Sequence, residues 1–143
     1  MSDNNLVYES NLTKCQLAIE EAMENGLEAL ALYIRDQAVR NITSTHLVDT
    51  GNLRSSVNYR VDAPNKKASV GTNVEYAIYT EFGTGIYAEN GLGRKTPWFY
   101  TDSKGQGHIT RGMKPRRWLR DAFERNHEQM KKVYMIAYND KLK

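Results

Sequence analysis

The residues of this chain that could perform chemistry are few and lie far apart in the sequence. Its three histidines, His46, His108 and His127, have no cysteine or carboxylate at the spacing that metal ligation requires, so no metal site is predicted. The single cysteine, Cys15, has no local histidine partner that would activate a thiolate. We therefore expect no catalytic residue, no enzyme activity and no cofactor.

The segment Gly91–Thr96 contains the residue types of a phosphate-binding loop, but not their order. A P-loop places Gly-Lys-Ser/Thr after an earlier glycine and then enters a helix. Here Arg94 separates Gly93 from Lys95, and Pro97 with three aromatic residues follows. The sequence therefore does not predict a nucleotide site.

Cations and aromatic residues between positions 94 and 120 are the best candidates for an active surface. Cations at a helix N-terminus are disfavoured by about 0.3–1 kcal/mol each, so three arginines at the start of the last helix suggest that they meet an anion. That anion is either a carboxylate patch on a neighbouring subunit or DNA phosphate, because aromatic residues beside cations are typical of protein interfaces and of nucleic-acid stacking platforms. An isolated, solvated run of charge is the remaining alternative. The candidate interface residues are Arg94, Lys95, Trp98, Phe99, Tyr100, Lys104, Arg111, Lys114, Arg116, Arg117 and Arg120.

The charges are unevenly distributed along the chain. The formal net charge is +3, yet residues 1–43 are mainly acidic and residues 94–117 are mainly basic. A chain with one acidic and one basic end can stack head-to-tail on copies of itself or bind a complementary partner. The alternative is that these charges only keep the surface solvated.

The length and composition fit one globular domain, residues 1–143. Hydrophobic residues make up 40% and charged residues 26% of the chain, which is ordinary for a folded, soluble protein. No apolar run approaches the roughly 20 residues of a membrane helix, and no secretion signal is visible. We therefore expect no membrane contact, and the single cysteine suits a reducing cytoplasm.

The elements that would position these residues begin with a long helix. Apolar residues recur at helical spacing from Ile19 to Ile42, which predicts an amphipathic helix with one buried stripe. Thr13 and Gln16 have the spacing of a capping box at its start. Gly26 lies inside the stripe, where glycine lowers helix stability by about 1 kcal/mol relative to alanine. We therefore expect it to allow close packing on another element.

A helical turn and a β-hairpin are expected next. A polar cap before Leu53 predicts a single turn of helix over residues 49–55, with Leu53 anchored in the core. Residues 57–71 alternate in polarity around the turn residues 64–67, which predicts two antiparallel strands.

The middle of the chain leads into a glycine-rich arm. Residues 73–82 fit either a strand or a short helix, and Asn73 as a cap with Gly83 as a terminator favours the helix. Residues 83–112 hold seven of the ten glycines, and so long a connection within a compact domain is usually functional. Within it, residues 98–111 predict a second hairpin, so we expect an arm that projects from the domain at about 83–112.

The last predicted element is a helix that starts at Pro115, where a missing N–H is harmless. The fold class is therefore α+β. We expect a small antiparallel β-sheet with the long N-terminal helix and the C-terminal amphipathic helix packed on one face.

Three short segments together resemble a known family. Val48–Ser56 contains the pattern TG-x-L-[RK]-x-S, Glu75–Gly85 contains YA-x-Y-x-E-F-GT, and Lys114–Phe123 contains P-x-x-[FW]-[LM]-x-x-A. In this order they resemble the tail-completion (minor tail or neck component) family of long-tailed bacteriophages. The residues that carry the resemblance are Asp49, Thr50, Gly51, Leu53, Tyr76, Ala77, Glu81, Phe82, Gly83, Thr84, Pro115, Leu119 and Ala122.

The resemblance implies a non-enzymatic virion protein that is assembled in the bacterial host cytoplasm. Such proteins form a ring, usually sixfold, at the head–tail junction or the head-proximal end of the tail. The implied partners are copies of the chain itself, a head connector or stopper on one side, and a tail terminator or tail tube on the other. A weak contact with DNA in the lumen is also expected.

The resemblance further implies that Glu81–Gly85 belongs to the fixed framework of the subunit and sets the direction of the arm. Glu81 and Thr84 are expected to bond backbone groups there. The alternative function is a nucleic-acid-binding protein that uses the basic and aromatic residues from Trp98 to Arg120.

Overall fold

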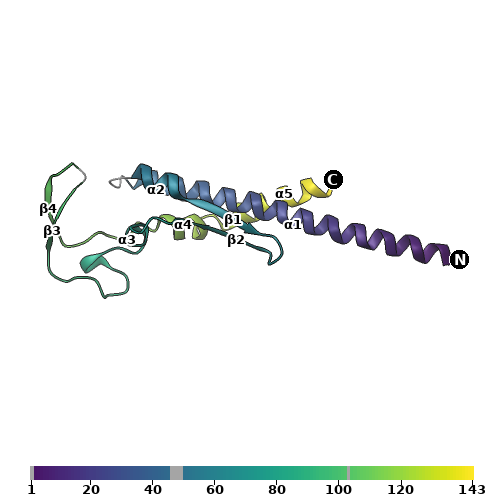
Figure 1. Ribbon diagram of the computed structural model, residues 1–143, viewed down its shortest axis with the longest axis horizontal. Coiled ribbons are helices and arrows are strands. Elements are labelled where there is room, and N and C mark those ends of the chain that lie inside the picture. Colours follow the sequence, from purple (N-terminus) through teal and green to yellow (C-terminus); the bar gives the residue numbers. More distant parts are fainter. Residues whose placement is uncertain (1, 46–49, 103) are drawn as a thin grey trace. The chain divides into compact units, whose positions relative to one another are not determined.

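A computed structural model describes residues 2–45, 50–102 and 104–143, with side chains from residue 12 onward except that of residue 50 (Figure 1). The chain divides into two compact units. The first unit comprises residues 1–36, 58–70 and 126–143, and the second comprises residues 37–57 and 71–125. Helices occur together with two separate two-stranded sheets, so the predicted α+β class is confirmed.

The first unit combines most of helix α1 (Ser2–Ser44) with strands β1 (Asn58–Asp62) and β2 (Lys67–Gly71) and helix α5 (His127–Leu142). A Cβ added to Gly26 of α1 would lie 2.6 Å from the ring of Tyr134 on α5, so the two helices approach closely there. The Asn25 side chain donates to the Ala137 carbonyl at 2.8 Å. The predicted close packing at Gly26 is therefore confirmed.

Strand β1 is tied to the same helix. The Tyr59 hydroxyl donates a 2.7 Å hydrogen bond to the Glu28 carboxylate, and this bond raises the pKa of the tyrosine. Strands β1 and β2 are joined by a turn in which Lys66 has a φ of 55°. The predicted first hairpin is confirmed, with its strands shifted by about one residue.

Helix α1 begins earlier than predicted. It starts at Ser2 rather than near Thr13 and continues without interruption to Ser44. Neither glycine nor proline occurs before Gly26, so nothing stops the helix from propagating through the capping-box residues. The predicted apolar stripe is correct at Ile34 and Ile42, whose side chains are buried, but Ile19 is 45% exposed.

The second unit contains the last turns of α1, helix α2 (Thr50–Ser56), helix α3 (Ala77–Phe82), the short 3₁₀ helix η1 (Gly85–Tyr87), and helix α4 (Trp118–Glu124). Strands β3 (Trp98–Thr101) and β4 (Gly107–Thr110) complete it. The predicted turn of helix and the second hairpin are thus confirmed. Its buried apolar side chains are Ala38, Ile42, Leu53, Val57, Ala77, Trp118 and Ala122.

Trp118 organises the core of this unit. Its indole N–H donates to the Thr80 hydroxyl at 3.0 Å, and its carbonyl accepts from the Asn41 side chain of α1 at 3.0 Å. Only 2% of its surface is exposed. Burial of so large a side chain with its polar atom satisfied holds α1, α3 and α4 together.

The structure decides the open question at residues 73–82 and corrects the last predicted helix. Residues 77–82 are helical, as favoured, but the helix begins after Tyr76 rather than at Asn73, and it ends at Gly83 with a φ of 82°. The single last helix that was predicted from Pro115 is wrong. Two helices, α4 and α5, are separated at residues 125–126, because Asn126, a residue that favours caps over helix interiors, ends the regular run.

Candidate functional site

The base of the arm is a close-packed junction of three glycines, Gly85, Gly93 and Gly112, which we call the glycine junction. A Cβ on Gly85 would collide with the Arg111 carbonyl, and one on Gly93 would collide with the carbonyl of Gly85. A Cβ on Gly112 would collide with the Thr84 carbonyl. Backbone can come this close only where side chains are absent, so these glycines allow the two ends of the arm to pack on each other.

Hydrogen bonds cross the same junction. The Thr84 N–H donates to the Met113 carbonyl at 2.9 Å, and the Met113 N–H donates back to the Thr84 hydroxyl at 2.9 Å. The Ile86 N–H donates to the Arg111 carbonyl at 3.1 Å. The Thr84 side chain therefore bonds a backbone group, as expected, and the two ends of the arm are fixed against each other.

The β3–β4 hairpin carries exposed apolar side chains on both faces. Phe99 and Ile109 lie directly opposite each other in the antiparallel register and are 67% and 78% exposed. Tyr100 lies opposite His108, and their rings stack at a centroid distance of 5.1 Å. An isolated two-stranded hairpin is only marginally stable in water, so a hairpin with these side chains is suited to binding another surface.

Asp102 fixes the turn of this hairpin. Its carboxylate accepts hydrogen bonds at 2.9 Å from the backbone N–H groups of Lys104 and Gln106, and it lies 2.8 Å from Nε2 of His108. The bond with His108, followed by the two backbone bonds, holds the pKa of Asp102 below its usual value. The sequence predicts a turn that begins at Asp102, because an aspartate favours that position, but it does not indicate the bond between Asp102 and His108.

A buried carboxylate organises the start of α4. Glu81 is 4% exposed and accepts 2.9 Å hydrogen bonds from the backbone N–H groups of Leu119 and Arg120. The same carboxylate accepts a 2.8 Å bond from Nε of Arg120. An anion at this position satisfies free N–H groups at a helix N-terminus.

Arg120 connects this carboxylate with the base of the arm. Its Nη1 and Nη2 atoms donate to Glu89 at 2.7 and 3.0 Å. The bonds with Glu89 and Glu81 raise the pKa of Arg120, and the bond from Arg120 lowers the pKa of Glu89. Arg120 therefore meets its anions within its own chain.

Arg117 also pairs within the chain. It adopts a left-handed backbone conformation, with a φ of 51°, just before α4. Its side chain donates to Asp121 at 3.2 Å and to Glu124 at 2.6 Å. Two of the three arginines at this helix start are thus neutralised by carboxylates of the same unit.

The other predicted cations are available to a partner. In the part of the chain that the structure describes, six of them make no ion pair, although two lie over aromatic rings. Arg94 lies over the ring of Trp98 at 5.7 Å, and Lys114 lies over the ring of Tyr87 at 5.8 Å. The six are Arg94, Lys95, Lys104, Arg111, Lys114 and Arg116.

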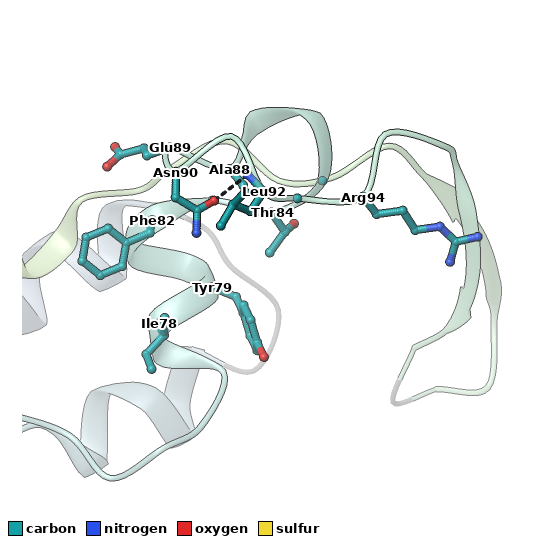
Figure 2. A pocket seen from close by; sticks show the side chains of 12 residues that line it. Ile78, Tyr79, Phe82, Thr84, Ala88, Glu89, Asn90, Leu92 and Arg94 are labelled. Atoms are coloured by element: carbon teal, nitrogen blue, oxygen red, sulfur yellow. Dashed lines mark hydrogen bonds between the residues drawn. The ribbon is translucent and has the colours of Figure 1, made fainter.

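An open, largely apolar pocket of about 430 Å³ lies between α3 and the first part of the arm, and we call it the α3 pocket (Figure 2). Ile78, Tyr79 and Phe82 line it from α3. Leu92, which is 86% exposed, lines it from the arm together with Arg94. Exposed apolar side chains that surround a hollow are typical of sites that bind another molecule.

The remaining motif residues differ in their burial. Leu53, Ala77 and Ala122 are buried. Pro115 packs so closely against Gly83 that a Cβ on the glycine would collide with its ring. Asp49 and His46 lie outside the described residues, and so does the side chain of Thr50. Gly51 is exposed in α2.

Two kinds of feature are absent from the part of the chain that the structure describes. Within residues 2–45, 50–102 and 104–143, no group of three or more histidine, cysteine, aspartate or glutamate side chains could hold a metal ion. Over the same described ranges, no helix is both long and apolar enough to cross a membrane.

Comparison with protein families identifies the class of the chain. Residues 8–83, more than half of the sequence, match the model of the family described as "Bacteriophage HK97-gp10, putative tail-component". No curated protein and no solved structure matches the chain. The chain belongs to the HK97 gp10-like family of bacteriophage tail components. The resemblance predicted from the three motifs is thereby confirmed at the level of the family.

Proposed function

We propose that this chain is a structural tail-completion subunit, copies of which form a ring at the head-proximal end of a phage tail, where the tail joins the head. Membership of a family of tail components supports a structural role in the virion. The observation that carries the finer proposal is the arm. An exposed two-stranded hairpin is held on a tightly packed base, and its apolar side chains are open to solvent.

A ring requires two different patches on each subunit that bind each other head-to-tail. The charges supply a complementary pair. Helix α1 carries exposed glutamates within the first unit, among them Glu20, Glu21 and Glu24. The arm in the second unit carries the cations that are not paired within the chain. Opposite charges on different copies attract and set the order of contact, while like charges keep free subunits apart.

The ring has the symmetry of the tail, which is sixfold. It contacts a head connector or stopper on one side and a tail terminator or the tail tube on the other, and DNA passes through its lumen. No step of this assembly needs a catalytic residue, because the subunit acts by binding alone.

Deletion of the gene from the parent phage tests the proposal directly. Electron microscopy of the lysate should show DNA-filled heads and separate, unattached tails. Purified subunit added to that lysate should restore joined particles and infectivity. Joined, infectious particles formed without the gene would overturn the proposal.

A charge reversal tests the contribution of the arm. Arg111→Glu should lower the yield of joined particles at least tenfold, because it places a carboxylate where a partner's anion is expected. Lys132→Glu is the matched control, since Lys132 is an exposed cation on α5 in the first unit. Equal yields from the two variants would contradict a role for the charge of the arm.

Binding of DNA by the same arm is the second candidate function, and exposed Phe99 and Tyr100 beside free cations favour it. It is tested by fluorescence anisotropy with duplex and single-stranded DNA at about 50 and 200 mM salt. A micromolar affinity that falls steeply with salt would place DNA binding first. Under the structural proposal, the purified subunit shows only weak binding that Arg111→Glu changes little relative to Lys132→Glu.

A further inference from the structure

We propose that the α3 pocket of one subunit receives the Phe99–Ile109 face of the hairpin of a second copy. This inference rests on the proposed ring and names the contact that would build it. The pocket and the hairpin belong to the same unit of the chain, and each is left open there.

The pocket has the properties of an anchor site. Its volume of about 430 Å³ is sufficient for an aromatic and an aliphatic side chain together. Ile78, Tyr79 and Phe82 are 64%, 57% and 44% exposed, so a substantial apolar area is in contact with water when the pocket is empty. Aromatic anchors that fill such pockets contribute most of the binding energy in many interfaces.

The hairpin offers a matching pair of side chains. Phe99 and Ile109 lie opposite each other on one face, and the Phe99 ring lies over Gly107, where a Cβ would be 2.6 Å from Cε2. Any side chain at position 107 would displace the ring. The ring therefore lies against the backbone of Gly107, on the face of the hairpin that also carries Ile109.

Several features favour a second copy as the occupant. The glycine junction fixes both ends of the arm. The α3 pocket is open and Phe99 is 67% exposed, so the hairpin does not fill the pocket of its own subunit. If each hairpin enters the pocket of the next subunit, every copy uses one hairpin and one pocket. That is a heterologous contact, which closes into a ring when the rotation between subunits allows it.

Charge and size fit this arrangement. Glu75, just before α3, is exposed and makes no ion pair among the described residues. It lines a second hollow that shares Ile78 and Phe82 with the α3 pocket. Lys104, in the turn between β3 and β4, and Arg111, directly after β4, supply the opposite charge. A specific interface uses about 20–30 residues from each partner. The lining of the two hollows along α3 is of this order, and the described residues 95–102 and 104–111 of the hairpin approach it.

The test is a cysteine cross-link in assembled particles. In a Cys15→Ser background, Leu92→Cys is combined with Ile109→Cys, and purified tails are treated with a short bismaleimide. Denaturing gels should show a ladder of linked subunits that ends at the ring. Leu92→Cys combined with Met135→Cys, an exposed position on α5, is the control and should give no ladder.

The outcomes separate this inference from the proposed function. Rings that are visible in joined particles but yield no ladder from the Leu92–Ile109 pair would overturn the contact and leave the ring intact. A ladder from the control pair at equal intensity would also overturn it, because the linkage would then be non-specific. Joined particles in the gene deletion would instead overturn the proposed function.

A matched pair of substitutions gives a second readout. Phe99→Ala and Leu92→Asp alter opposite sides of the proposed contact, and each should lower particle yield at least tenfold. Ile136→Ala changes an apolar side chain on α5 that is equally exposed, at 65%, and it should leave the yield unchanged. Circular dichroism of each purified variant verifies that it is folded, and folded variants with normal yields would contradict the contact.

Discussion

The guanidinium of Arg120 lies 2.8 Å from the buried carboxylate of Glu81, and this contact ties α4 to α3. The same carboxylate accepts hydrogen bonds from two backbone N–H groups at the start of α4. The same guanidinium donates a hydrogen bond to Glu89 at the base of the arm. Glu81 thus joins the framework of the second unit to the arm that we propose to be its binding element.

Glu81→Gln should destabilise the second unit by roughly 2–3 kcal/mol, because hydrogen bonds to a charged group are lost and Arg120 keeps only part of its anionic environment. Chemical denaturation followed by the fluorescence of Trp118, in a Trp98→Phe background, would measure the loss. Glu75→Gln is the control, because Glu75 is exposed, and it should change stability by less than about 0.5 kcal/mol. Equal effects of the two substitutions would show that Glu81 does not hold α4.

Gly85→Ala should disrupt the base of the arm. Its φ is 60°, which costs an L-residue roughly 1–2 kcal/mol, and the added Cβ would collide with the Arg111 carbonyl. Gly91→Ala is a matched control, since Gly91 has a φ of 72° but nothing within 4 Å of an added Cβ. Hydrogen exchange at the Ile86 amide should accelerate in the Gly85 variant only. Acceleration of the same size in both variants would mean that backbone conformation, not close packing, decides the effect.

Gly26→Ala should reveal the packing of α1 against α5. Alanine gains about 1 kcal/mol of helix propensity over glycine, but the added Cβ would lie 2.6 Å from the Tyr134 ring. The substitution should therefore stabilise the chain more in a Tyr134→Ala background than in the natural one. A double-mutant cycle on the free energy of unfolding measures this coupling, and a coupling energy near zero would contradict the contact.

His108→Ala should raise the pKa of Asp102 toward its ordinary value of 3.8, because the bond with His108 is the largest cause of the depression. The folded-state pKa is lowered, so the carboxylate stabilises the hairpin above about pH 4. That stabilisation disappears as the pH falls through the lowered pKa. A carbon-detected NMR titration of the Asp102 carboxyl measures the shift. Lys104→Ala keeps the backbone N–H and should leave the pKa low, and an unchanged value in the His108 variant would contradict the assignment.

The features that the sequence predicted well are those that a few neighbouring residues determine. The turn of helix anchored by Leu53, both hairpins, and the end of α3 at Gly83 depend on local turn and cap chemistry. The break between α4 and α5 was missed because apolar spacing continues across it, and a single Asn126 decides it.

The contacts that could not be predicted join residues that are distant in the chain. Arg120 is 39 residues from Glu81 and 31 residues from Glu89, and no local pattern indicates which carboxylate an arginine will meet. The sequence analysis therefore assigned Arg117 and Arg120 to a partner, whereas the structure places carboxylates of the same unit against both. The glycine junction is equally non-local, since Thr84 and Gly112 meet across the whole arm.

The glycine junction also has a genetic consequence. Every codon change that replaces glycine introduces at least a Cβ, so Gly85, Gly93 and Gly112 have no conservative neighbour among the amino acids. Gly105, at the tip of the hairpin, has a φ of 82° but nothing within 4 Å of an added Cβ, so an exchange there costs backbone strain without a collision. A change at the tip of the hairpin can thus alter what the arm binds without altering how the arm is mounted on its three-glycine base.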